Sequence, residues 1–159
     1  MNVDLFLRSY FATTQRRSGA RCVSMEAMGP SATLEQAQDA EARHLFALTV
    51  MGRLERTQAI APVAVEVLRR YYLSLNPQHV VLLRAGMVGR YTISLGPGES
   101  PPPNVGIEAD DLQSWCDWAA VARDTGLKSG RTAQKVWWSA RQVVQAELER
   151  REEVARRSA

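Results

Sequence analysis

The chain has few of the residues that build metal centres or catalytic sites. It contains two cysteines, Cys22 and Cys116, and two histidines, His44 and His79, which lie far apart among its 159 residues. A zinc site needs about four nitrogen or sulfur ligands, usually in close pairs. The sequence also lacks a glycine-rich phosphate loop and a nucleophile elbow. We therefore expect no metal, no cofactor, no catalytic residues and no enzymatic activity.

Long apolar runs are missing as well. No stretch reaches the roughly 18 apolar residues that a membrane-spanning helix needs. Residues 2–12 carry Asp4 and Arg8, which the apolar region of a secretory leader would not. The net charge of +3 is too small an excess to identify a nucleic-acid binder without its distribution. The sequence predicts a cytoplasmic protein with no membrane partner.

Helical periodicity is the main positive signal. Apolar residues recur three and four positions apart through most of the chain, which predicts a mainly α-helical bundle. We expect helices over residues 2–14, from Ser31 or Thr33 to about 56, over 62–75 and from 77 to about 85, with a loop over 15–32. The second of these helices is expected to bury the stripe Leu34, Ala37, Ala40, His44, Leu45, Leu48, Met51 and Leu54.

The periodicity stops between residues 86 and 106, where glycine and proline are dense. Within this stretch residues 90–95 are β-prone and predict one strand or hairpin arm. The sequence therefore divides into three expected parts. These are an N-terminal helical scaffold over 1–86, a β-prone loop or linker over 87–108, and a helix-turn-helix with a long last helix over 109–159.

The predicted helix-turn-helix depends on two small residues. Ala122 supplies the small side chain needed where two helices cross, and Gly126 supplies a left-handed turn residue four positions later. We expect the first helix to start at Asp110 or Asp111 and to end at Gly126. The acidic residues at that start, Asp117 included, suit the positive end of a helix better than acid–base chemistry.

The second helix is expected to begin near Ser129, an N-cap residue, and to run to about Arg156. Its apolar face is expected to comprise Ala133, Val136, Trp137, Ala140, Val143, Val144 and Leu148. From Lys128 to Ala146 there are four basic residues and no acidic one, which is typical of a recognition helix. We predict double-stranded DNA as the partner, contacted by Lys128, Ser129, Arg131, Thr132, Lys135, Trp138 and Gln142.

Two features of this helix leave alternatives open. A helical wheel points Trp138 outward beside Lys135, where it either stacks on a base or meets a protein, unless the bundle covers it. Beyond residue 145 both charge signs mix, with pairs such as Glu147–Arg151. That composition predicts a solvent-exposed or self-associating helix end, and no phosphate-binding face.

Two segments together resemble a known family. The sequence VLRRYYL at 67–73, then WAAVA at 118–122 and Gly126-Leu127, look like helices of a sigma-factor region-4-type domain. Late-gene antiterminators of the Q type, from bacteriophages, are similar in these elements and in size. The resemblance implies binding to DNA near a promoter and contact with RNA polymerase. Residues 128–142 would then read the DNA, and the N-terminal helices would face polymerase or a second copy.

The sequence departs from that pattern in two ways. About forty residues separate the Tyr-Tyr element from the later helices, where a short turn is usual, and the paired cysteines of zinc-bearing Q proteins are absent. Two other functions therefore stay open. One is a DNA-packaging adaptor of the small-terminase type, which forms a ring as a homo-oligomer. The other is a protein-interaction module without DNA binding.

Overall fold

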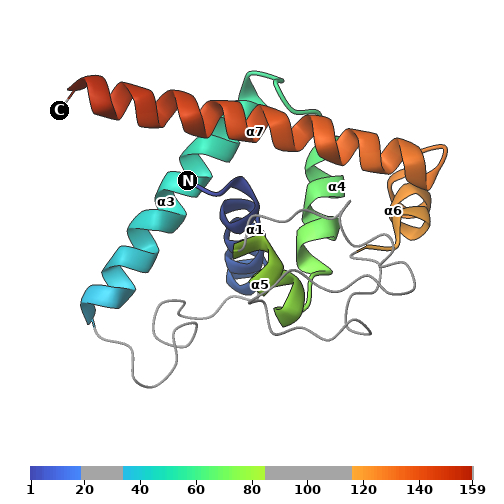
Figure 1. The fold of residues 1–159 in the computed structure, drawn as a ribbon, viewed down its shortest axis with the longest axis horizontal. Coiled ribbons are helices and arrows are strands. Elements are labelled where there is room, and N and C mark those ends of the chain that lie inside the picture. Colours follow the sequence, from blue (N-terminus) through green and yellow to red (C-terminus); the bar gives the residue numbers. More distant parts are fainter. Residues whose placement is uncertain (19–33, 85–115, 159) are drawn as a thin grey trace, which may run out of the picture.

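The computed structural model describes residues 1–18, 34–84 and 116–158, which form six helices (Figure 1). The helices are α1 (Val3–Ser18), α3 (Leu34–Arg56), α4 (Pro62–Leu73), α5 (Pro77–Arg84), α6 (Trp118–Thr125) and α7 (Gly130–Ser158). No strand occurs among these residues, so the prediction of a mainly α fold is confirmed. Segment 87–108, where the sequence predicts β-prone structure, lies outside the described residues.

Local signals set several helix boundaries. α4 begins at Pro62, whose fixed φ suits the first turn and whose missing N–H would have had no partner there. At the start of α5, Asn76 Oδ1 accepts from the His79 N–H at 2.9 Å, and His79 Nδ1 accepts from the Asn76 N–H at 3.2 Å. The buried His79 therefore has a structural role as part of the cap of α5. The predicted starts of α4 and α5 and the end of α3 at Arg56 are confirmed.

α1 is longer than the sequence predicts. It continues to Ser18, through the first residues of the expected loop over 15–32. Residues 15–18 contain neither glycine nor proline, and Arg16 Nε donates to the carbonyl of Ala12 at 3.2 Å. Glutamine and arginine are good helix formers, so nothing stops the helix before that point. The predicted helix start at Ser31 or Thr33 lies outside the described residues, as does most of that loop.

The buried face of α3 also differs from the prediction. Leu45 and Leu48 are exposed, whereas Ala47 and Val50 are buried instead. His44, Met51 and Leu54 are buried as expected. The helix has apolar residues on more than one side, so periodicity alone could not tell which side meets the bundle.

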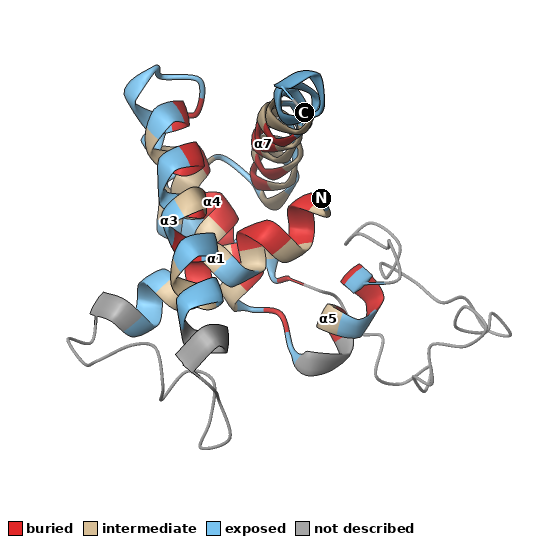
Figure 2. Ribbon diagram, turned by 90° about the vertical axis from the view of Figure 1, so that its left-hand side faces the viewer, coloured by how far each residue is buried: buried red, intermediate tan, exposed pale blue. Residues whose placement is uncertain are grey.

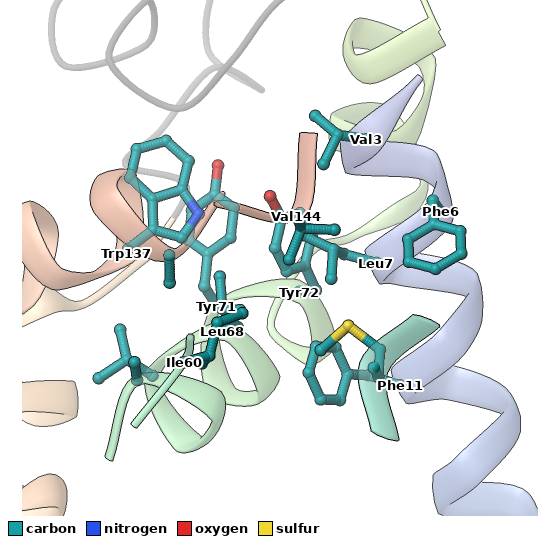
Figure 3. Packing of buried hydrophobic residues seen from close by; sticks show 14 of the residues in the cluster. Val3, Phe6, Leu7, Phe11, Ile60, Leu68, Tyr71, Tyr72, Trp137 and Val144 are labelled. Carbon is teal, nitrogen blue, oxygen red and sulfur yellow. The ribbon is translucent and has the colours of Figure 1, made fainter. Parts of the chain in front are cut away.

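α7 lies across the other helices, and its buried side packs on α1, α3, α4 and α6 (Figure 1). Figure 2 shows buried residues on the facing sides of α1, α4 and α7. α4 is the central element, because Val67, Leu68, Tyr71 and Tyr72 are all completely buried. The buried apolar residues of all six helices form one cluster, part of which is drawn in Figure 3.

Aromatic rings join α4 to both C-terminal helices. Tyr71 of α4 stacks on Trp118 of α6, with ring centroids 5.3 Å apart and planes 13° apart. The same ring lies 4.7 Å from that of Trp137 of α7, and the two tryptophans are 5.5 Å apart. Such ring pairs add about 0.5–1.5 kcal/mol each beyond the area they bury. α4 is therefore the helix on which both C-terminal helices rest.

A buried ion pair links α1, α4 and α7. Arg141 of α7 donates to both carboxylate oxygens of Asp4, through Nε at 2.9 Å and Nη2 at 2.7 Å. The Tyr72 hydroxyl donates to the same carboxylate at 2.6 Å. Burial, and then the charge and hydrogen bond of Asp4, raise the pKa of Tyr72 well above its usual value. Burial alone would lower the pKa of Arg141, but the hydrogen bond and charge of Asp4 outweigh it and raise the pKa.

Asp4→Asn is expected to lower the free energy of unfolding by about 3–5 kcal/mol, because it leaves the Arg141 charge buried without a counter-charge. Urea denaturation followed by circular dichroism measures this loss. The matched control is Glu66→Gln, which removes a carboxylate from half-exposed contacts with Arg69 and Arg70 and is expected to cost less than about 1 kcal/mol.

The triple variant Asp4→Leu with Arg141→Met and Tyr72→Phe is expected to recover most of that loss, because it leaves neither a buried charge nor a buried hydroxyl without its acceptor. Equal, small losses for Asp4→Asn and Glu66→Gln would show that the buried pair does not carry this stability.

Candidate nucleic-acid interface

A tight turn joins α6 to α7. Asp117 caps α6 by accepting from the Ala120 N–H at 3.1 Å. Gly126 follows the helix in the left-handed region with φ +76°, and the Ala122 carbonyl accepts from the Leu127 N–H at 2.8 Å. This pattern closes a helix with a glycine in the left-handed region. Gly126 has the left-handed conformation predicted for it and ends α6, and Ala122 is buried.

The start of α6 differs from the prediction. The helix begins at Trp118, and Cys116 and Asp117 precede it in a non-helical conformation. Asp110 and Asp111, the expected caps, lie outside the described residues. Asp117 takes the capping role because its carboxylate lies at the helix start, where the free N–H groups need an acceptor. Cys116 is buried, and burial raises the pKa of its thiol to about 11, so it stays protonated.

α7 begins as the sequence predicts, directly after Ser129. Ser129 Oγ accepts from the Thr132 N–H at 3.2 Å, and its carbonyl accepts from the Ala133 N–H at 3.1 Å. The hydroxyls of Ser129 and Thr132 are 3.1 Å apart. Both predicted contact residues are thus part of the helix cap, and Thr132 is only half-exposed.

Gly130 is a residue that the sequence analysis missed. A Cβ at this position would lie 3.0 Å from the backbone nitrogen of Ala119 and 3.0 Å from the carbonyl carbon of Trp118. The backbones of α6 and α7 therefore meet at Gly130, and no other residue type fits without a shift. A glycine at the first position of a helix, just after a serine cap, was the available signal.

The exposed face of α7 agrees in part with the predicted one. Lys128, Ser129, Arg131, Lys135 and Gln142 are all exposed. Residues 135 and 142 follow residue 131 by four and eleven positions, so all three lie on one side of the helix. The predicted apolar face is confirmed, because all seven of its residues are buried or packed against the core.

Trp138 does not point outward as the helical wheel predicts. Its indole is half-buried and packs against the core. The ring lies 5.6 Å from that of Trp137, and the Arg141 guanidinium lies 5.0 Å from its centroid. Position 138 is at the border between the exposed and buried faces, and a ring of this size reaches the core from there. The bundle therefore covers much of this side chain.

The cations of this region are also distributed differently. Arg141, one of the four basic residues between Lys128 and Ala146, turns inward to Asp4, and its side chain is 11% exposed. Arg123 of α6, which the sequence analysis left out, is 76% exposed. The adjacent Asp124 lies 3.1 Å from Arg70 and 3.8 Å from Arg123, so cations offset its charge.

The far end of α7 carries ion pairs rather than a uniformly positive face. Glu147 accepts from Arg150 and Arg151, each at 2.8 Å. The hydrogen bond from Arg150, and then that from Arg151, lower the pKa of Glu147 to about 2, with burial acting in the opposite direction. Glu153 accepts from Arg157 at 2.6 Å. The predicted Glu147–Arg151 pair is confirmed, and this part of the helix holds both charge signs close together.

Other kinds of site are not evident among the residues that the structure describes. Within 1–18, 34–84 and 116–158, no group of three or more His, Cys, Asp or Glu side chains could hold a metal ion. None of the helices in these ranges is long and apolar enough to span a membrane. No protein family, curated protein or solved structure matches the chain.

Gly130→Ala is expected to lower the free energy of unfolding by about 1–3 kcal/mol, because the added methyl group meets backbone atoms that cannot move aside singly. The matched control is Gly52→Ala in α3, where a Cβ meets nothing within 4 Å. That change is expected to stabilise the fold by up to about 1 kcal/mol. Thermal and urea unfolding measure both effects, and a harmless Gly130→Ala would contradict the close approach of α6 and α7.

Proposed function

We propose that this chain binds duplex DNA through the first turns of α7 and acts as a transcription regulator of phage type. The observation that carries the proposal is the grouping of three exposed cations, Lys128, Arg131 and Lys135, at the N-terminal end of this helix. No acidic residue occurs from Lys128 to Ala146. The positive end of the helix dipole adds to their field, so a phosphate or a guanine edge is favoured there.

Each side chain has a role that suits its chemistry. Arg131 carries a planar fork of donors that matches the two acceptors of guanine in the major groove. Lys135, about 6 Å further along the axis, is a point charge suited to a phosphate. Gln142 lies on the same side and can bond to an adenine edge. The proposal gives Trp138 no base-stacking role, because its indole is half-buried and packs against the core.

The remaining elements of the unit hold this face in place. Stacking of Tyr71 on Trp118, and the ion pair of Arg70 with Asp124, anchor α6 to α4. Gly130 lets α7 meet α6 at backbone distance. Arg123 extends the positive surface onto α6 and suits a backbone phosphate beside the groove. A rigid support of this kind is what precise groove recognition needs.

The role in transcription rests on the resemblance to sigma region-4-type domains and Q-type antiterminators. In that scheme α7 contacts a site near a promoter, and α1, α3 and α4 face RNA polymerase or a second copy. Particle size and DNA binding distinguish two other functions from this one. A packaging adaptor would form a large ring, and a pure interaction module would not bind DNA.

The double variant Arg131→Ala with Lys135→Ala is expected to weaken binding to duplex DNA and to reduce the slope of log affinity against log salt by about 2. Fluorescence anisotropy on a labelled duplex, at several salt concentrations, measures both quantities. The matched control is Arg156→Ala with Arg157→Ala, which removes the same charge from exposed positions at the other end of α7. Equal effects of the two double variants would sink the proposed interface, since only net charge would then matter.

Selection of bound duplexes from a random pool, with and without RNA polymerase, tests the role in transcription. Enrichment of a sequence only when polymerase is present is expected for an antiterminator that acts at a promoter. Enrichment by the protein alone would indicate an autonomous regulator. A ring-sized particle by light scattering would favour the packaging adaptor instead.

A further inference from the structure

One side of α7 stays exposed well beyond its first turns. Between residues 131 and 146 the exposed residues are Arg131, Lys135, Ser139, Gln142 and Ala146. They follow one another at intervals of three or four residues, which places all five within about 80° around the helix. The buried residues of α7 lie on the side turned toward the other helices (Figure 2), centred about 180° away. We call these five exposed residues the outer stripe.

The polar side chains of the outer stripe differ from those further along the same helix. All four of them lack a hydrogen bond or ion pair to another residue within the described part of the chain. By contrast, Glu149, Arg150 and Glu153 in the following turns each bond to another side chain of α7. Such pairs are usual on a helix face that meets only water. The donors and acceptors of the outer stripe are therefore available to a partner.

Ser139 lies at the centre of the outer stripe. Serine in a helix interior is about 0.5 kcal/mol less favourable than alanine. The exposed hydroxyls of Thr49 and Ser158 each bond to the carbonyl four residues before them, at 2.9 Å. The Ser139 hydroxyl makes no such bond, so it is free both to donate and to accept. Ser139 was not among the contact residues predicted from the sequence.

The sizes of the side chains suit the major groove of duplex DNA. α7 is one continuous helix over Gly130–Ser158, and a helix with its side chains is about 10–12 Å across. The major groove is about 12 Å wide and about 8.5 Å deep. A helix of this diameter enters the groove over several turns only where its outward side chains are short. Ser139 and Ala146 are short, and Gln142 between them is long enough to reach a base edge.

The charges along the outer stripe set the limits of the contact. Arg131 and Lys135 are positive at one end, and the next charge on this side of the helix is the acidic Glu149. Phosphates are therefore attracted at the first end and repelled beyond Ala146. The part between these limits, from residue 131 to residue 146, is about 22 Å long. That length corresponds to about six base pairs, at about 3.4 Å each.

From these observations we propose that α7 lies lengthwise in the major groove, with the Ser139 hydroxyl at a base edge and Ala146 at the far limit of the contact. The inference rests on the proposed DNA binding and extends it from the first turns of α7 to the whole outer stripe. In the common arrangement the N-terminal residues of a recognition helix contact the bases. That arrangement would leave Ser139 and Ala146 in solvent.

Charge changes of both signs at Ala146 test how far the duplex extends along α7. Ala146→Glu is expected to weaken binding at least about tenfold, and Ala146→Lys to strengthen it about threefold, because each new charge lies beside phosphates. The matched controls are Ala42→Glu and Ala42→Lys, at an exposed position of α3. They make the same change in net charge and are expected to alter affinity less than about twofold, because salt screens distant charges. Fluorescence anisotropy on a short labelled duplex measures all four variants.

Ser139→Met tests the close approach of the helix without a change of charge. Methionine is a good helix former, so the fold is retained, but its longer side chain holds α7 away from the floor of the groove. Binding is expected to weaken at least about tenfold, whereas the control Ala42→Met is expected to bind as the wild type does. Ser139→Ala removes only the hydroxyl and is expected to weaken binding about two- to tenfold.

The results separate this proposal from the proposed function. If Arg131→Ala with Lys135→Ala weakens binding while every change at Ser139 and Ala146 matches its control at Ala42, α7 binds through its first turns and lengthwise docking alone is wrong. Equal losses in Ala146→Glu and Ala146→Lys also contradict it, because phosphate charge would then not be responsible. A wild-type chain that binds no duplex overturns both proposals. Unchanged circular dichroism of each variant confirms that the fold is retained.

Discussion

The placement of α7 on the bundle depends on the ion pair between Asp4 and Arg141. Two charges are removed from water here, which costs several kcal/mol, and the cost is met only because both carboxylate oxygens and the Tyr72 hydroxyl are bonded. The hydrogen bonds of this pair depend on how α7 is rotated about its own axis. If α7 turned about its axis by one residue position, the Arg141 guanidinium would lose both hydrogen bonds to Asp4. The pair therefore specifies how α7 lies on α1 and α4.

That rotation decides which residues of α7 reach solvent. Arg131 precedes Arg141 by ten residues, which places the two about 80° apart around the helix. With Arg141 fixed inward against Asp4, Arg131 and Lys135 lie on the exposed side. The Tyr71, Trp118 and Trp137 rings add a second constraint near the turn. Stability and the proposed binding face thus depend on the same contacts.

Much of this structure was predictable where a residue acts locally. Pro62, Asn76-Pro77, Gly126 and Ser129 each mark a helix boundary through their own backbone chemistry, and each marks it in the structure. The apolar face of α7 was predictable because its stripe is continuous. These signals need no knowledge of a partner element.

The sequence-based predictions were wrong where contacts with residues distant in the chain determine the structure. Nothing near Arg141 in sequence indicates that its counter-charge lies 137 residues away, in the first turn of α1. The choice between Leu45 and Val50 on α3 depends on where α1 and α7 pack. Trp138 packs against the core because its ring contacts that of Trp137. Glycine is needed at position 130 because the backbone of α6 passes close to it. Periodicity gives a helix its faces, but the assembled bundle selects which face is buried.

The distance along the chain between Asp4 and Arg141 also has a consequence during synthesis. At about 5–20 residues per second, a ribosome needs on the order of ten seconds to proceed from the first of these residues to the second. Between the synthesis of α4 and that of α7, Val67, Leu68 and Tyr71 lack part of the set of neighbours that buries them. The chain completes its core only once α7 has emerged.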